Sequence, residues 1–191
     1  MGKKFYLISG LIFFWFIFSS MQAEIILYDG YHQLKAKTPD GLIIELQDGS
    51  YFKVYSADSY RVKEWEEDTI LKLSPAYWSR YADFYLTNID DGYYIRADYF
   101  RPPLLDHPKT YIISHVDNYY GEVEIRDSTS KSWWQIDEED IPLIENWRNG
   151  DTIVVGLNHG WFSFYYKHSD HILLNYDNMG QATYVNAKKT A

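Results

Sequence analysis

Two histidines and an aspartate near the end of the chain form a pattern that could bind a metal ion. They lie in the stretch His168-Ser169-Asp170-His171, and His159 precedes them. Histidines at this spacing can share one side of a turn, and an aspartate can supply a third ligand to Zn²⁺ or a similar ion. We therefore take His168, Asp170 and His171 as candidate metal ligands. A catalytic histidine and histidines that merely contact solvent are the alternatives, and the last is the simplest interpretation.

Paired carboxylates are the second group that could do chemistry. Glu-Glu-Asp occurs at 66–68 and at 138–140. Two neighbouring acids could act as the acid and base of a glycosidase. One run follows Trp65 whereas the other precedes Trp147, so the two runs are not one repeated feature. A solvated acidic surface is the simpler interpretation.

Other chemistry has little support in the sequence. The chain has no Cys, no Gly-x-Ser-x-Gly elbow and no Gly-rich phosphate loop, so we expect neither a covalent nucleophile nor a cofactor. The pairs Asn88-x-Asp90 and Asn175-x-Asp177 predict turns in which side chains cap their own backbone. A Ca²⁺ site at these oxygen-rich turns is the alternative.

Aromatic residues are the strongest indication of binding. The chain has 7 Trp, 19 Tyr and 10 Phe. Trp78 and Trp161 follow two similar strands at equal distances, and Tyr77 and Phe162 stand beside them. Rings flanked by Asp and Asn suit stacking on sugars or gripping a peptide. The alternative is that small domains without disulfides bury many rings in their cores.

These candidates are embedded in a sequence that repeats itself. Residues 43–54 and 123–136 each read as a strand ending in Asp, a small-residue turn and a strand with two aromatics. Trp65 and Trp147 follow at equal spacing, and each is followed by Asp-Thr-Ile. Several matches in the same order indicate a tandem duplication.

Each repeat is predicted to be mostly β. It reads as about five short strands and one helical turn, after a leading strand in 24–40 or 111–115. This predicts two small barrels, SH3-like or OB-like, with Trp65 and Trp147 in their cores. Asp58 and Asp140 suit the N-caps of the helical turns.

The hairpin and the Trp-x-x-(Gly)-Asp-apolar pattern resemble small, uncharacterised exported bacterial β-domains. The resemblance covers about fifteen positions in each repeat, and it implies a fold without implying an activity. We place repeat 1 at 24–97, a proline-rich linker at 98–110, repeat 2 at 111–187 and a polar tail at 188–191. The linker holds three of the six prolines.

The N-terminal segment predicts export. Residues 1–23 combine a basic start, an apolar run from Phe5 to Phe18 and a small-residue end, as in a signal peptide. An uncleaved anchor is the alternative. We expect no membrane span after cleavage, because no later run is long and apolar enough. A cysteine-free exported chain suits a bacterial periplasm, envelope or extracellular space.

The net negative charge limits the classes of binding partner that we expect. Loss of the two lysines in residues 1–23 takes the formal charge from −9 to −11, which disfavours nucleic acid. We expect a non-enzymatic binding or structural module with a glycan, cell-wall or protein ligand. A hydrolase acting on envelope polymers and a metal-binding protein are the alternatives.

Overall fold

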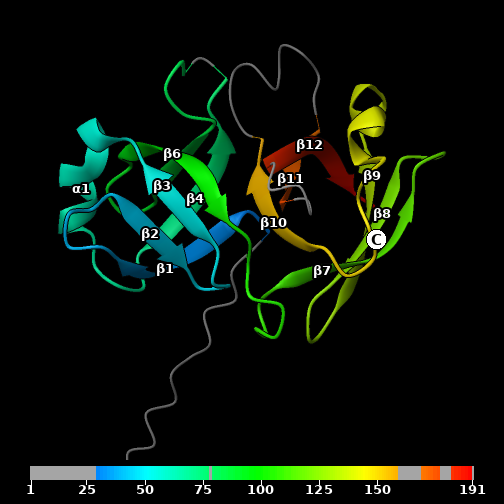
Figure 1. Ribbon diagram of the computed structural model, residues 1–191, viewed down its shortest axis with the longest axis horizontal. Helices are drawn as coiled ribbons and strands as arrows, with labels where there is room; N and C mark the ends of the chain where they lie inside the picture. Colours follow the sequence, from blue (N-terminus) through cyan, green and yellow to red (C-terminus); the bar gives the residue numbers. More distant parts are fainter. Residues whose placement is uncertain (1–28, 78, 159–168, 177–181, 191) are drawn as a thin grey trace, which may run out of the picture.

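The first half of the chain folds into a closed antiparallel barrel in the computed structural model, which describes residues 29–77, 79–158, 169–176 and 182–190 (Figure 1). The six strands of this first barrel are β1 (Tyr31–Lys37), β2 (Ile43–Leu46), β3 (Tyr51–Val54), β4 (Ile70–Pro75), β5 (Phe84–Asn88) and β6 (Tyr94–Arg101). Their order is β1-β2-β3-β6-β5-β4, and β4 closes the barrel against β1. Side chains alternate between the two faces of each strand, which buries Ile44 and Leu46 in the core.

The second half repeats this connectivity. The strands of the second barrel are β7 (Tyr111–Asp117), β8 (Glu122–Arg126), β9 (Lys131–Ile136), β10 (Thr152–Leu157), β11 (His171–Tyr176) and β12 (Ala182–Lys189). Their order is β7-β8-β9-β12-β11-β10, and β10 closes against β7. The prediction of two tandem, mostly β barrels is confirmed, and the leading strand supplies the sixth strand of each.

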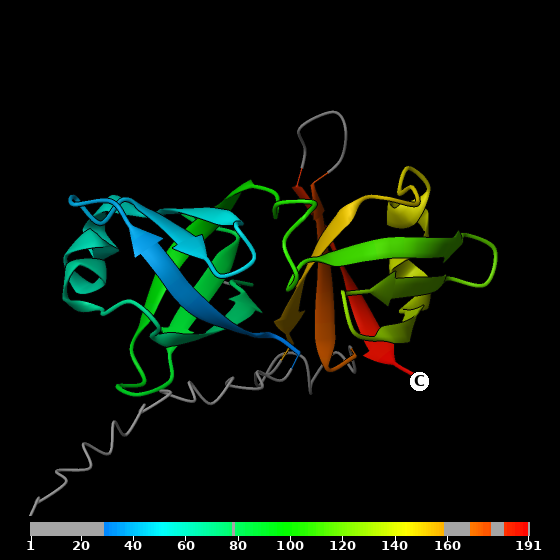
Figure 2. The same ribbon diagram turned by 90° about the horizontal axis from the view of Figure 1, so that it is seen from below.

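A short helical segment follows the third strand of each barrel. In the first barrel these are η1 (Ser56–Asp58) and α1 (Ser59–Glu64), and in the second barrel η2 (Glu138–Ile144). The three-residue spacing buries Val62 with Trp65 and Ile144 with Trp147. The views in Figures 1 and 2 place α1 on the side of the first barrel that faces away from the second. No helix among the described residues is long and apolar enough to cross a membrane.

The structure corrects the alignment of the repeated Asp-Thr-Ile phrase. Asp68 stands three residues after Trp65, and Gly150 stands three residues after Trp147. The backbone N–H groups of both residues donate to the leading strand of their barrel at 2.8 Å. Both have positive φ, 70° for Asp68 and 97° for Gly150. Asp68 therefore corresponds to Gly150 and not to Asp151, and the strands align without a gap.

Asp58 occupies the predicted N-cap position of α1, whereas the N-cap of η2 is Asp137 and not Asp140. Neither Asp58 nor Asp140 makes a capping bond; each carboxylate binds the last strand of its barrel instead. Asp58 accepts hydrogen bonds from the backbone N–H of Arg96 at 2.9 Å and from its guanidinium at 2.7 and 2.8 Å. Asp140 accepts from the backbone N–H of Asn186 at 2.6 Å and from its amide at 2.7 Å. Each aspartate thus ties the helical segment to the barrel.

Asp58→Asn is expected to lower the free energy of unfolding by about 1–3 kcal/mol at pH 7. The guanidinium of Arg96 holds the pKa of Asp58 below its ordinary value. Because the folded-state pKa is the lower one, the stabilisation is present above about pH 4 and is lost as pH falls through the folded pKa. Urea unfolding between pH 7 and pH 2 should therefore show the variant approaching wild type in acid. The exposed-site variant Asp106→Asn is the control, and a difference that persists at pH 2 would contradict the prediction.

The segment between the barrels is shorter and better packed than the predicted linker. β6 continues to Arg101, so 98–101 belongs to a strand and only 102–110 connects the barrels. Leu104 donates its backbone N–H to the Asp48 carbonyl at 3.0 Å. The buried Thr110 hydroxyl donates to the Leu104 carbonyl at 2.7 Å. The connection is therefore bound to the β2–β3 hairpin.

The two barrels share an apolar contact surface. Val155 of β10 points into the second core, whereas its neighbour Val154 belongs to the first core together with Ile172 and Leu174 of β11. Figures 1 and 2 show β10 and β11 between the barrels. Nε2 of the buried His32 donates to the Val155 carbonyl at 2.7 Å. One face of β10 and β11 thus completes the core of the first barrel.

Candidate functional site

The predicted aromatic site is only partly within the described residues. Trp78, Trp161 and Phe162 lie outside them, so only Tyr77 can be placed. Its ring is 41% exposed, and its hydroxyl donates to Oδ1 of Asn158 in the second barrel at 2.8 Å. Burial of the hydroxyl raises the pKa of Tyr77 to about 12. Tyr77 therefore contributes a neutral hydrogen bond between the barrels.

The predicted metal ligands are likewise only partly described, since His168 lies outside these residues. Asp170 is exposed. The ring of His171 packs edge-on against Trp134 at 5.2 Å, and the ammonium of Lys189 lies 5.7 Å from the same Trp134 ring. Among the described residues, no group of three or more His, Asp and Glu side chains could hold a metal ion. His171 thus covers an indole in the second barrel.

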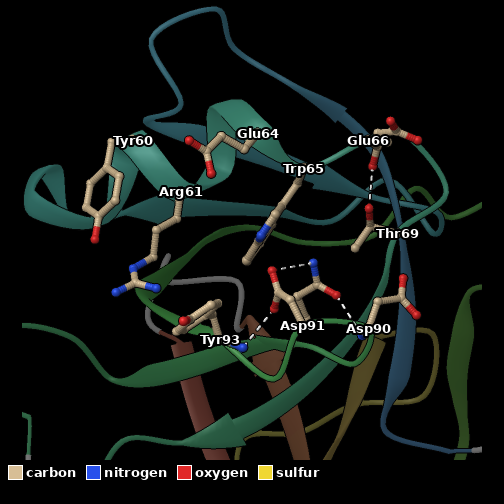
Figure 3. A pocket seen from close by; sticks show the side chains of 10 residues that line it. Tyr60, Arg61, Glu64, Trp65, Glu66, Thr69, Asp90, Asp91 and Tyr93 are labelled. Carbon is tan, nitrogen blue, oxygen red and sulfur yellow. Dashed lines mark hydrogen bonds between the residues drawn. The ribbon is translucent and has the colours of Figure 1, made fainter.

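A hollow of about 640 Å³ opens beside α1 on the first barrel, and we call it the tyrosine hollow (Figure 3). Tyr60 and Arg61 come from α1, and Trp65 directly follows that helix. Asp91 and Tyr93 come from the β5–β6 hairpin opposite. The hollow is therefore built from a helix and a hairpin that the barrel brings together.

Its exposed walls are aromatic and held in place. Tyr60 is 56% and Tyr93 58% exposed. The guanidinium of Arg61 lies 5.3 Å from the Tyr60 ring and 4.6 Å from the Tyr93 ring. These distances are within the range of cation–π attraction, which fixes the rings relative to one another.

Carboxylates dominate the charge of the tyrosine hollow. They are Glu64, Glu66, Asp90 and Asp91, whereas Arg61 is the one cation in the lining. Asp91 accepts hydrogen bonds from the side chain of Asn88 at 3.2 Å and from the backbone of Tyr93 at 2.7 Å, which shapes the hairpin. The lining therefore offers many acceptors beside a ring surface.

Trp65 adds a donor. Its side chain is only 4% exposed, and its indole Nε1–H has no acceptor among the described residues. The Nε1 atom is not sealed off from solvent. Figure 3 shows the indole pointing from the end of α1 toward the loop with Asp91. Because solvent reaches Nε1–H, a ligand atom that accepts from it would take the place of water in this hydrogen bond.

A second hollow of about 660 Å³ adjoins the first and shares Arg61 and Tyr93 with it. We call it the arginine hollow, because Arg80 and Arg96 also line it. Four tyrosines, Tyr81, Tyr85, Tyr93 and Tyr94, complete most of the wall. The two hollows thus form one ring-lined surface.

The described residues of the second barrel differ from the first at several positions of the tyrosine hollow. Trp147 occupies the position of Trp65, and Asn175 that of Asn88. The positions of Tyr60, Arg61, Glu66 and Tyr93, however, are filled by Pro142, Leu143, Arg148 and Thr183. Of the residues that line the hollow, Trp65 and Asn88 recur in the second barrel, whereas Tyr60, Arg61, Glu66 and Tyr93 do not.

Sequence reasoning missed Tyr60, Arg61, Tyr93 and Tyr94 as site residues. For Tyr60, Arg61 and Tyr93 the available signal was their difference from the second repeat, because a ring or charge absent from one repeat is not needed by the barrel itself. Tyr94 gave no such signal, since Tyr184 holds its position in the second barrel. Trp78 and Trp161 were instead chosen as candidates because they align between the repeats.

Comparison with known proteins does not name a family. No family model, curated protein or solved structure matches the chain.

Proposed function

We propose that the protein is an exported, non-enzymatic binding module whose tyrosine hollow holds a neutral saccharide. The observation that carries the proposal is the Nε1–H of Trp65, which has no acceptor among the described residues and lies in a hollow walled by exposed tyrosines. The apolar run at residues 5–18 supports export to the envelope or the extracellular space. Sequencing the N-terminus of the protein recovered outside the cytoplasm tests that part.

The lining favours a sugar over simpler ligands. A sugar hydroxyl can accept from Trp65 and donate to a carboxylate such as Asp91, and the sugar ring can pack on Tyr93. An isolated cation would leave the indole N–H unused. A fully anionic ligand would meet the carboxylates of this hollow.

The experiment is a binding screen followed by substitution of the donor. Oligosaccharides and cell-wall fragments are screened against the purified protein, and the best neutral binder is titrated by calorimetry. Trp65→Phe keeps a ring but removes Nε1–H, so we expect about tenfold weaker binding, the worth of one hydrogen bond. Trp147→Phe makes the same change at the corresponding core position of the second barrel and should leave affinity unchanged.

Three outcomes would contradict the proposal. They are the absence of any saccharide binding, a Trp65→Phe affinity equal to that of wild type, and an equal loss from Trp147→Phe. Thermal unfolding of both variants shows whether each remains folded at the titration temperature. The Tyr93→Ala variant supplies a further test, because its exposed ring contributes to the wall and not to the core.

A further inference from the structure

The arginine hollow has the opposite charge to the tyrosine hollow beside it. Among the described residues, its lining contains Arg61, Arg80 and Arg96 but a single carboxylate, that of Asp58. Arg96 donates hydrogen bonds to the carboxylate of Asp58 from Nε at 2.7 Å and from Nη2 at 2.8 Å. Arg61 and Arg80 have no carboxylate partner among the described residues. Arg80 thus leaves positive charge in this hollow, whereas the charge of Arg61 is partly offset by the four carboxylates of the adjoining tyrosine hollow, which Arg61 also lines.

Aromatic rings contact two of the three cations of this hollow, Arg61 and Arg96. Arg61 lies against Tyr93 at 4.6 Å, and Arg96 lies against Tyr55 at 4.4 Å. Tyr55 in turn packs on Tyr81 at 5.3 Å. A guanidinium that is already held by a ring loses less conformational freedom when it binds an anion.

The surroundings make this positive charge unusual. The chain carries a formal charge of −9, so its overall field repels anions. Two arginines without an ion pair in the described part of the chain offset that repulsion locally. Because the hollows share Arg61 and Tyr93, a single ligand can occupy both.

We infer that the arginine hollow binds a carboxylate carried by the saccharide, with Arg80 as the principal partner and Arg61 beside it. The ligand is then an acidic sugar whose neutral part packs in the tyrosine hollow. A planar guanidinium matches a carboxylate through two parallel hydrogen bonds, which favours this group. The inference rests on the proposed saccharide function and adds the class of sugar.

The test compares sodium glucuronate, glucose and sodium acetate as probes of the purified protein, using ¹H–¹⁵N NMR titrations. Wild type should bind glucuronate about tenfold more tightly than glucose, the worth of a charge-assisted hydrogen bond. Arg80→Gln should remove this preference and leave glucose binding unchanged. Arg126→Gln makes the same charge change at an exposed site of the second barrel and should have no effect. The preference should fall as salt rises.

The outcomes separate this inference from the proposed function. Equal affinity for glucuronate and glucose, or an equal effect of Arg126→Gln, would overturn the carboxylate site and leave the saccharide module standing. Acetate binding that depends on Arg80, without binding of either sugar, would support an anion site and contradict the saccharide function. Glucuronate binding that Arg80→Gln does not weaken would overturn the assignment of Arg80.

Discussion

Trp65→Ala is expected to lower the free energy of unfolding by about 3–5 kcal/mol, and Trp147→Ala by a similar amount. The two indoles are 4% and 3% exposed and pack in the two cores, so truncation leaves a cavity as well as removing apolar contact. Domains of this size are stable by about 5–15 kcal/mol, so either substitution removes a large part of the total. Urea unfolding monitored by far-ultraviolet circular dichroism measures the loss.

A matched control is available in the second barrel. Trp133 is only half-buried and lies beside His115 at 5.7 Å, so Trp133→Ala should cost clearly less than Trp147→Ala. If all three variants unfold at the same urea concentration as wild type, then the two aligned tryptophans do not stabilise the barrels. If Trp133→Ala costs as much as Trp147→Ala, the difference in burial does not decide the effect.

Val154→Asp is expected to destabilise both barrels together, by several kcal/mol. Val154 is fully buried between the barrels and belongs to the core of the first barrel although it lies in the second. A carboxylate there would be buried without a cation, which is among the costliest single changes. Differential scanning calorimetry should show a single transition for wild type, because the shared core couples the barrels, and a much lower transition temperature for the variant.

Lys72→Asp supplies the control for this prediction. Lys72 holds the position of Val154 in the first barrel, but it is only partly buried and lies outside the shared core. Its replacement should change stability far less, as surface substitutions usually do. Two separate transitions in wild type, or a Val154→Asp transition at the wild-type temperature, would show that the contact surface contributes little.

The repeated phrase made the architecture predictable. The tryptophans and their β-branched neighbours recur because each barrel needs the same core, and strand alternation is a local property of the chain. The contact surface also left a signal: β10 and β11 lack alternation, as strands buried on both faces do. That signal identifies buried strands but does not identify what covers them.

The residues of the candidate site could not be predicted from the sequence, because they are far apart in the chain. They come from α1, from the loop after Trp65 and from the β5–β6 hairpin, which meet only when the barrel closes. Tyr60 and Tyr93 resemble the many tyrosines that lie in or near cores. Only the three-dimensional arrangement shows that their rings stay exposed around an indole N–H that has no acceptor among the described residues.

The docking of the second barrel on the first is heterologous, because different surfaces of two similar units meet. Such contacts can in principle recur and build an open filament. The first barrel receives its partner beside Phe84 and Tyr99, which lie 5.7 Å from Tyr184 and Tyr176 respectively. The second barrel has His171 and Lys189 at the positions of Phe84 and Tyr99.

The opposite surface is altered as well. The first barrel has Lys72 and Thr87 where the second has Val154 and Leu174. Neither free surface of the pair therefore offers the apolar match that a third barrel would need. The differences between the duplicated halves thus disfavour repetition of this contact between copies of the protein.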